Sequence, residues 1–211
     1  FESLSDELTL ILEKDIQIKN EFNNKKINVD TFAKKTLGQI VFLYFLQKKG
    51  WLGISKNSSN KFNKWGSGPK NFVEVIYNDF ISKNKKDSNF FNDILEPLFY
   101  DALNTERDNN YYEKLNCKIP FLNGGLFEPI NEYDWITTNI KISNDLIFKI
   151  IETFNRYNFT VKEDEPLEKE VAVDPEMLGK VFENLLTENL RKGKGSYYTP
   201  REIVQFMCRE T

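Results

Sequence analysis

The feature that most constrains the fold is the segment Val29–Lys49, in which apolar side chains recur every three or four positions. Between Ile40 and Leu46 the segment is apolar on nearly every side. A helix with so little polar surface is stable in water only when other elements cover it. The spacing therefore predicts a long buried helix around which the rest of the chain packs. Gly50 and Gly53 follow it and are typical of a helix end.

Four further segments show the same helical spacing of apolar residues. We expect helices near residues 4–16, 71–83, 90–103 and 143–157. The polar, glycine-containing residues 55–69 predict a loop. The sequence thus predicts a mainly α fold, in which a helical bundle carries a small α+β insertion.

Two segments interrupt the helical pattern. Residues 119–127 combine a proline and an Asn-Gly-Gly turn with large apolar residues, which predicts a packed loop with positive φ angles. Residues 135–142 alternate loosely and predict a short strand. Its partner is either residues 159–161 or residues 171–173, and the pattern does not decide between them.

The composition excludes several kinds of active site. The 211 residues include no histidine, so catalytic triads, a histidine general base and histidine metal sites are absent from this chain. No Asp or Glu has a lysine two positions later, which excludes the metal site of a common nuclease class. The two cysteines, Cys117 and Cys208, are too far apart for a redox pair and indicate reduced thiols in a cytoplasmic protein. No apolar run is long enough to cross a membrane.

Basic residues are concentrated in one part of the chain. Residues 25–86 hold 13 lysines and three acidic residues, whereas the whole chain has a net charge of −3. Aromatic residues and glycines are interleaved with Lys56, Lys61, Lys64 and Lys70. This pattern favours sequence-independent contact with the phosphate backbone of DNA, and the alternative is a solvated lysine-rich face. The stretch contains no arginine, which argues against reading of base edges.

The last forty residues contain two helix starts. Asp174 and Pro175 supply an N-cap and a proline at the first helical position, and an apolar stripe follows. Thr199, Pro200 and Glu202 form a capping box, which predicts that a second helix begins at Thr199.

The second helix start is a candidate anion site. Its open N–H groups lie beside a basic, glycine-containing loop, and such groups bind anions. Tyr197 and Tyr198, directly before the cap, are able to wall a ligand pocket. The alternative is that the box only caps a surface helix.

Four blocks of the sequence resemble the connector region of type IIG restriction-modification enzymes, which fuse a nuclease, a helical spacer and an adenine-N6 DNA methyltransferase. The blocks are YFLQKKGWL at 44–52, IPFLNGGLFE at 119–128, VDPEMLGKVFEN at 173–184 and KGSYYTPREIVQFM at 194–207. The last block is the specific one and resembles the methyltransferase motif X. The adenine methyltransferases of phage-defence systems have a similar sequence before their catalytic domain and are a related possibility.

The resemblance implies a role for the cap at Thr199. In the intact parent, Tyr197, Tyr198, Thr199 and Pro200 would line the pocket for S-adenosylmethionine. It also implies as partners double-stranded DNA, contacted through its backbone, and the nuclease and methyltransferase domains of the same polypeptide. No residue of this chain is predicted to be catalytic or to bind a metal.

The chain also departs from the family. It lacks the glycine loop that holds the adenosyl group and the Asn-Pro-Pro-aromatic motif that grips the target adenine. We therefore expect an inactive fragment: residues 1–118 as the spacer bundle, 119–172 as the loop and the α+β insertion, and 173–211 as a helix pair with motif X. This pair would lead into a Rossmann-like methyltransferase domain outside the chain. The alternative is a structural or protein-interaction module without nucleic-acid contact.

Overall fold

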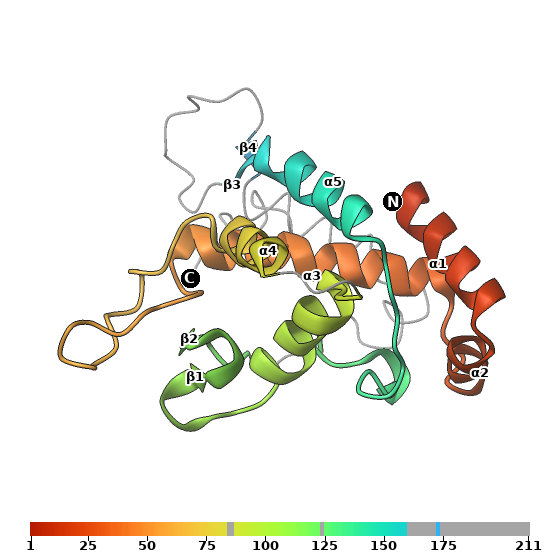
Figure 1. The fold of residues 1–211 in the computed structure, drawn as a ribbon, viewed down its shortest axis with the longest axis horizontal. Coiled ribbons are helices and arrows are strands. Elements are labelled where there is room, and N and C mark those ends of the chain that lie inside the picture. Colours follow the sequence, from red (N-terminus) through yellow and green to blue (C-terminus); the bar gives the residue numbers. More distant parts are fainter. Residues whose placement is uncertain (84–86, 123–124, 160–171, 174–211) are drawn as a thin grey trace, which may run out of the picture.

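The computed structural model describes residues 1–83, 87–122, 125–159 and 172–173, and this part of the chain is mainly helical (Figure 1). Its α-helices are α1 (Glu2–Lys14), α2 (Ile16–Asn24), α3 (Val29–Lys49), α4 (Phe72–Ser82) and α5 (Asn144–Asn155). Shorter helical segments are η1 (Phe91–Leu95), η2 (Pro97–Ala102), η3 (Asp108–Asn110), η4 (Glu113–Leu115) and η5 (Ile130–Glu132). The predicted mainly α fold is confirmed.

Helix α3 runs through the middle of the molecule, with α1, α4 and α5 around it (Figure 1). The side chain of Asn28 caps its start by accepting a hydrogen bond from the Thr31 N–H at 3.1 Å. Gly50 ends it in the left-handed conformation, with φ of 69°. Both limits are those predicted from the sequence, and Phe32 and Leu43 are among its fully buried residues.

The helix predicted over residues 4–16 is in fact two helices. Asp15 has an extended backbone, and its carboxylate accepts hydrogen bonds from the N–H groups of Gln17 and Ile18, at 2.8 and 3.2 Å. An aspartate in this position caps a new helix rather than continuing the previous one. Helix α2 therefore starts at Ile16, and that side chain is exposed instead of facing the core.

Residues 90–103 form the predicted helix, but most of it has the wider π geometry. Pro97 lacks an N–H group and interrupts the ordinary hydrogen-bond ladder. The N–H groups of Glu96 and Leu103 instead bond to the carbonyls five positions before them, on Phe91 and Leu98. This segment carries Glu96 into the interior, where it is fully buried.

The strand predicted over residues 135–142 is not formed. The Asp134 carboxylate accepts hydrogen bonds from the N–H groups of Ile136 and Thr137, at 3.1 and 3.2 Å, and so closes a turn that competes with an extended strand. The two segments predicted as its alternative partners contribute to a pair with each other: β3 (Asn158–Phe159) lies parallel to β4 (Ala172–Val173).

A hairpin that the sequence did not predict joins β1 (Tyr111–Tyr112) and β2 (Cys117–Lys118) in antiparallel register. Asn116 closes it in the left-handed conformation, with φ of 48°. Residues 119–122 and 125–127 are a loop, as predicted, and residues 123–124 lie outside the described part.

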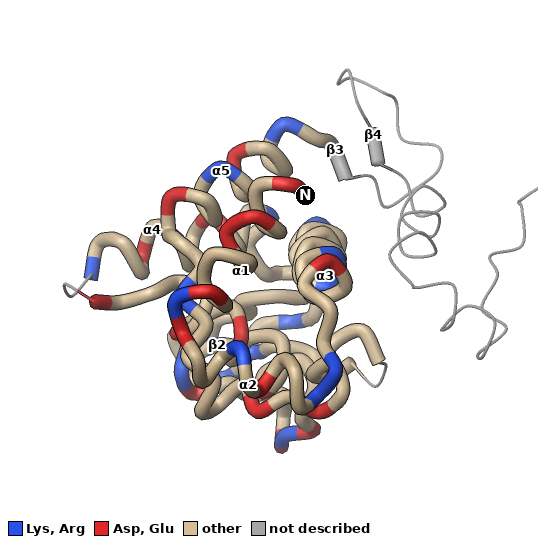
Figure 2. Tube along the Cα trace, turned by 90° about the vertical axis from the view of Figure 1, so that its right-hand side faces the viewer, with Lys and Arg blue, Asp and Glu red and all other residues tan. Residues whose placement is uncertain are grey.

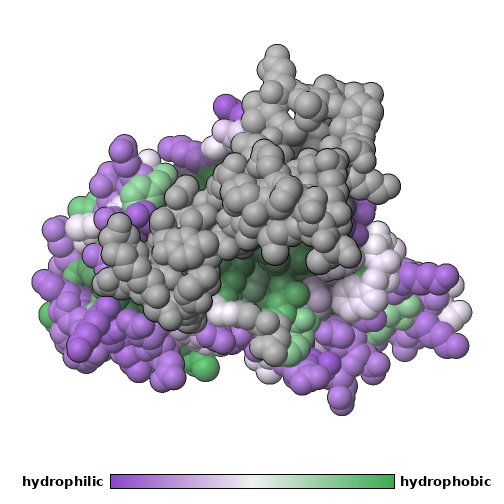
Figure 3. All heavy atoms as spheres, turned by 180° about the vertical axis from the view of Figure 1, so that it is seen from behind, coloured by the Kyte–Doolittle hydropathy of each residue, from purple (hydrophilic) through white to green (hydrophobic). Residues whose placement is uncertain are grey.

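One hydrophobic core connects the helices, from Leu4 in α1 to Ile151 in α5. It includes Ile119 and Phe127 beyond the hairpin, so the described parts of the first two predicted domains share this core. On the face opposite to Figure 1, apolar side chains show near the middle between polar margins (Figure 3). Within the described residues, no helix has both the length and the apolar character needed to cross a membrane. The division into domains stays a prediction.

Candidate nucleic-acid interface

Residues 55–70, here called the basic loop, project from the body of the molecule beside the end of α3 (Figure 1). The carbonyl of Gly50 accepts hydrogen bonds from the N–H groups of Gly66 and Gly68, at 3.1 and 3.0 Å. The ammonium of Lys70 donates to the carbonyl of Lys48 at 3.0 Å. Carbonyls at the end of a helix lack partners within it, so these contacts tie the loop to α3.

The tip of the basic loop is a tight turn. The N–H of Asn57 donates to the Lys61 carbonyl at 2.8 Å, and the N–H of Lys61 donates to the Asn57 side chain at 3.0 Å. Asn60 has a φ of 59°, a conformation that asparagine tolerates better than most residues. The turn leaves the side chains of Lys61 and Lys64 exposed.

Lysines and aromatic rings alternate along one side of the loop and the neighbouring hairpin. This group, here called the cation–aromatic row, consists of Lys56, Phe62, Trp65, Tyr111 and Lys118. The Lys56 Nζ lies 5.2 Å from the ring centroid of Phe62 and 4.9 Å from that of Tyr111. The Lys118 Nζ lies 4.5 Å from the centroid of Trp65 and 5.7 Å from that of Phe62.

These contacts position the ammonium groups without neutralising them. A cation over a ring gains about 0.5–1 kcal/mol at an exposed site and keeps its charge. Within the described residues, an ion pair joins Lys83 to Asp79 on α4, whereas Lys56, Lys61, Lys64 and Lys118 make none. Figure 2 shows the basic and acidic positions along the chain. The loop and hairpin therefore present four lysines that form no ion pair with a described carboxylate.

The predicted site residues have different surroundings. Lys56, Lys61 and Lys64 lie in one loop, but the ammonium of Lys70 is directed to backbone carbonyls. Tyr111 and Lys118 complete the surface from the hairpin, and neither was predicted from the sequence. The other predicted site residues lie outside the described part of the structure: Tyr197, Tyr198, Thr199 and Pro200.

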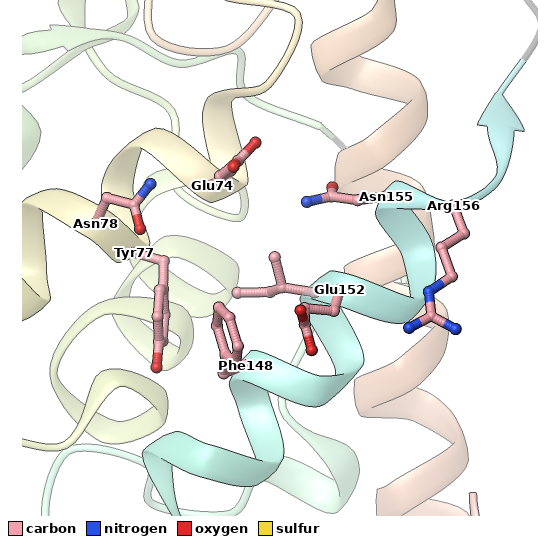
Figure 4. A pocket seen from close by; sticks show the side chains of 8 residues that line it. Glu74, Tyr77, Asn78, Phe148, Glu152, Asn155 and Arg156 are labelled. Carbon is pink, nitrogen blue, oxygen red and sulfur yellow. The ribbon is translucent and has the colours of Figure 1, made fainter.

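A groove of about 330 Å³ opens between α4 and α5 (Figure 4). The rings of Tyr77 and Phe148 stack in it with centroids 5.6 Å apart. It is lined by Glu74, Tyr77, Asn78, Phe148, Ile151, Glu152, Asn155 and Arg156. Within the described residues, no three metal-binding side chains come together, in this groove or elsewhere.

No family model matches the chain, and no solved structure matches it significantly. The chain is 32% identical over 200 residues to a Methanocaldococcus jannaschii protein named "Putative type II restriction enzyme and methyltransferase". The alignment covers 90% of this chain, which spans 15% of the length of that relative. The similarity confirms the predicted relation to type II restriction enzymes that carry a methyltransferase. It relates this chain to one region of such a protein.

Proposed function

We propose that the chain is the helical spacer and the N-terminal lip of the cofactor pocket in a type II restriction-modification protein that methylates adenine in DNA. The observation that carries the proposal is the similarity of nearly the whole chain to a small region of the relative. A region without the glycine loop and the Asn-Pro-Pro-aromatic motif suits a spacer better than a catalytic centre. The chain by itself is then inactive.

The role of the spacer would be to fix the distance between two other domains. One core joins α1, α3 and α5, and such a body is able to hold a nuclease and a methyltransferase at a fixed distance. The basic loop would lie along the DNA backbone. Lysine carries a compact charge without the planar fork that reads bases, so its contribution to affinity would not depend on sequence.

The lip would act on the cofactor. In the intact parent, Tyr197 and Tyr198 would wall the pocket. The helix predicted to begin at Thr199, with Pro200 in its first turn, would hold a carboxylate at its N-terminus. S-adenosylmethionine, when bound, supplies the methyl group for the exocyclic amine of adenine. A target base inside a duplex has to be flipped out to reach such a pocket.

Replacing Lys61 and Lys64 together with alanine is expected to weaken duplex DNA binding and to lower the salt dependence of the affinity. Each phosphate-bound lysine contributes about 1 to the slope of log affinity against log salt, so the double variant should lose about 2. Fluorescence anisotropy with labelled duplexes at several salt concentrations measures this slope. The loss of affinity should be equal for duplexes of unrelated sequence.

The matched control replaces Lys141 and Lys149, which are exposed and lie outside the basic loop, on and just before α5. It removes the same charge and should leave the slope nearly unchanged. Equal slopes for the Lys61/Lys64 variant and the unmodified protein would contradict the proposed backbone contact. Lys70 is left intact, because its ammonium holds the loop to α3.

Replacing Thr199 with alanine in the intact parent is expected to weaken binding of S-adenosylmethionine about fivefold. Loss of a threonine N-cap costs about 1 kcal/mol of helix stability, so a pocket that requires the folded helix start would lose up to about fivefold in affinity. Titration calorimetry measures the affinity, and circular dichroism checks that the helices remain. Unchanged affinity would mean that the box only caps a surface helix.

A structural or protein-interaction module is the second candidate, and the groove between α4 and α5 favours it. In that case, DNA binding by the chain would be weak and insensitive to salt. The salt titration described above therefore also separates the two candidates.

A further inference from the structure

We propose that the cation–aromatic row binds unpaired nucleobases, so that this face takes single-stranded DNA in preference to intact duplex. The inference rests on the proposed contact of the basic loop with the DNA backbone and adds a role for the rings. Bases within a duplex have both faces covered by their neighbours. An unpaired base offers a face on which an aromatic side chain can stack.

Trp65 is the ring best placed for such stacking. Its side chain is 44% exposed, although it is one of the largest apolar groups of the chain. The Lys118 Nζ lies over one face of the ring, 4.5 Å from its centroid, so a base would stack on the opposite face of the indole. Phe62 and Tyr111 continue the row as half-buried rings with centroids 5.5 Å apart.

The charges of the row suit a polyanion. Each stacked base carries a phosphate with it, and Lys56 and Lys118 are held over the rings by cation–π contacts. Lys61 and Lys64 add exposed ammonium groups on the same loop. None of these four lysines forms an ion pair with an acidic residue of the described chain. The face therefore offers ring surface and free positive charge together, as proteins that bind single strands do.

An apolar protein partner fits the same surface less well. Covering the row with apolar side chains would remove the ammonium groups of Lys56 and Lys118 from water without giving them an anion. Burial of an unpaired charge is strongly unfavourable. In a single-stranded nucleic acid, the bases would stack on the rings and the phosphates would contact the ammonium groups. Both the rings and the charges of the row would then have a partner.

The test replaces Trp65 with alanine in the full chain and measures affinity for a labelled oligothymidine and for a duplex of equal length at the same salt. The unmodified chain should bind the single strand more tightly. The variant should lose about tenfold in affinity for the single strand and less than twofold for the duplex. Trp65→Phe should restore most of the loss. Phe148→Ala is the control, since its ring is 42% exposed on α5, away from the row.

The outcomes separate this inference from the proposed function. If the Lys61/Lys64 variant weakens binding of both DNA forms but Trp65→Ala affects them equally or not at all, stacking is wrong and backbone contact stands. If Trp65→Ala acts on the single strand alone while the lysine variant changes nothing, stacking stands and backbone contact fails. Equally effective competition by polyglutamate and oligothymidine would reduce the row to a plain cationic surface and overturn the inference.

Discussion

Replacing Gly68 with alanine is expected to lower the free energy of unfolding by about 3 kcal/mol. A Cβ atom added at this glycine would lie 2.0 Å from the carbonyl oxygen of Leu52 and 2.9 Å from that of Gly50. Both neighbours are backbone atoms, so no side chain can turn aside to make room. The basic loop would have to separate from the end of α3, and the hydrogen bond from the Gly68 N–H to the Gly50 carbonyl would be lost.

Thermal unfolding monitored by circular dichroism measures this loss, and a drop of roughly 10 °C in melting temperature is expected for a domain of this size. Gly125→Ala is the matched control. Among the described residues, the nearest neighbour of its added Cβ would be Glu128 Oε2, at an ordinary 3.6 Å, so stability should stay the same or rise slightly. Equal melting temperatures for the two variants would show that the loop is not held against α3 in this way.

Local chemistry explains which helices were predictable. Helix α3 has a polar N-cap at Asn28 and a left-handed glycine at Gly50, so both ends are encoded within a few residues. The break between α1 and α2 was missed because Ile11, Leu12 and Ile16 continue one helical face in the sequence. Only the capping by Asp15 reveals the break, and Ile16 is in fact 66% exposed.

Long-range contacts explain what was missed at the candidate interface. The lysines of the basic loop were found because they lie close together in the sequence. Tyr111 and Lys118 belong to a hairpin about fifty residues further on, which reaches the loop through reciprocal backbone hydrogen bonds between Ile54 and Lys118. Strands of two residues give no recognisable alternation, so neither the hairpin nor its position against the loop could be read from the sequence.

A buried polar cluster in the core is expected to make the free energy of unfolding depend on pH. The Tyr133 hydroxyl donates a hydrogen bond to Glu96 Oε1, and the amide nitrogen of Gln39 donates to the Leu126 carbonyl at 2.9 Å. Within the described residues, Glu96 Oε2 and Gln39 Oε1 have no hydrogen-bond partner. Burial raises the pKa of Glu96 well above its usual 4.5, and the bond from Tyr133 lowers it by less.

Glu96 is therefore protonated in the folded protein over a pH range in which it is ionised in the unfolded chain. Its contribution to stability is fully present below about pH 4.5 and is lost as the pH rises toward the raised pKa. The loss amounts to at most about 1.4 kcal/mol for each pH unit. Protonation also gives the carboxyl group a hydrogen to donate, which the ionised form lacks.

Glu96→Gln is expected to make the protein more stable at neutral pH, by an amount that grows with pH up to the raised pKa of the glutamate. The amide keeps an oxygen for the Tyr133 hydroxyl and supplies N–H groups in place of the proton, and it does not ionise on unfolding. Urea unfolding at pH 5, 6, 7 and 8 measures the difference in free energy between the two proteins. Glu113→Gln, at an exposed position, is the matched control. A constant difference for Glu96→Gln would mean that the folded protein holds Glu96 in its ionised form.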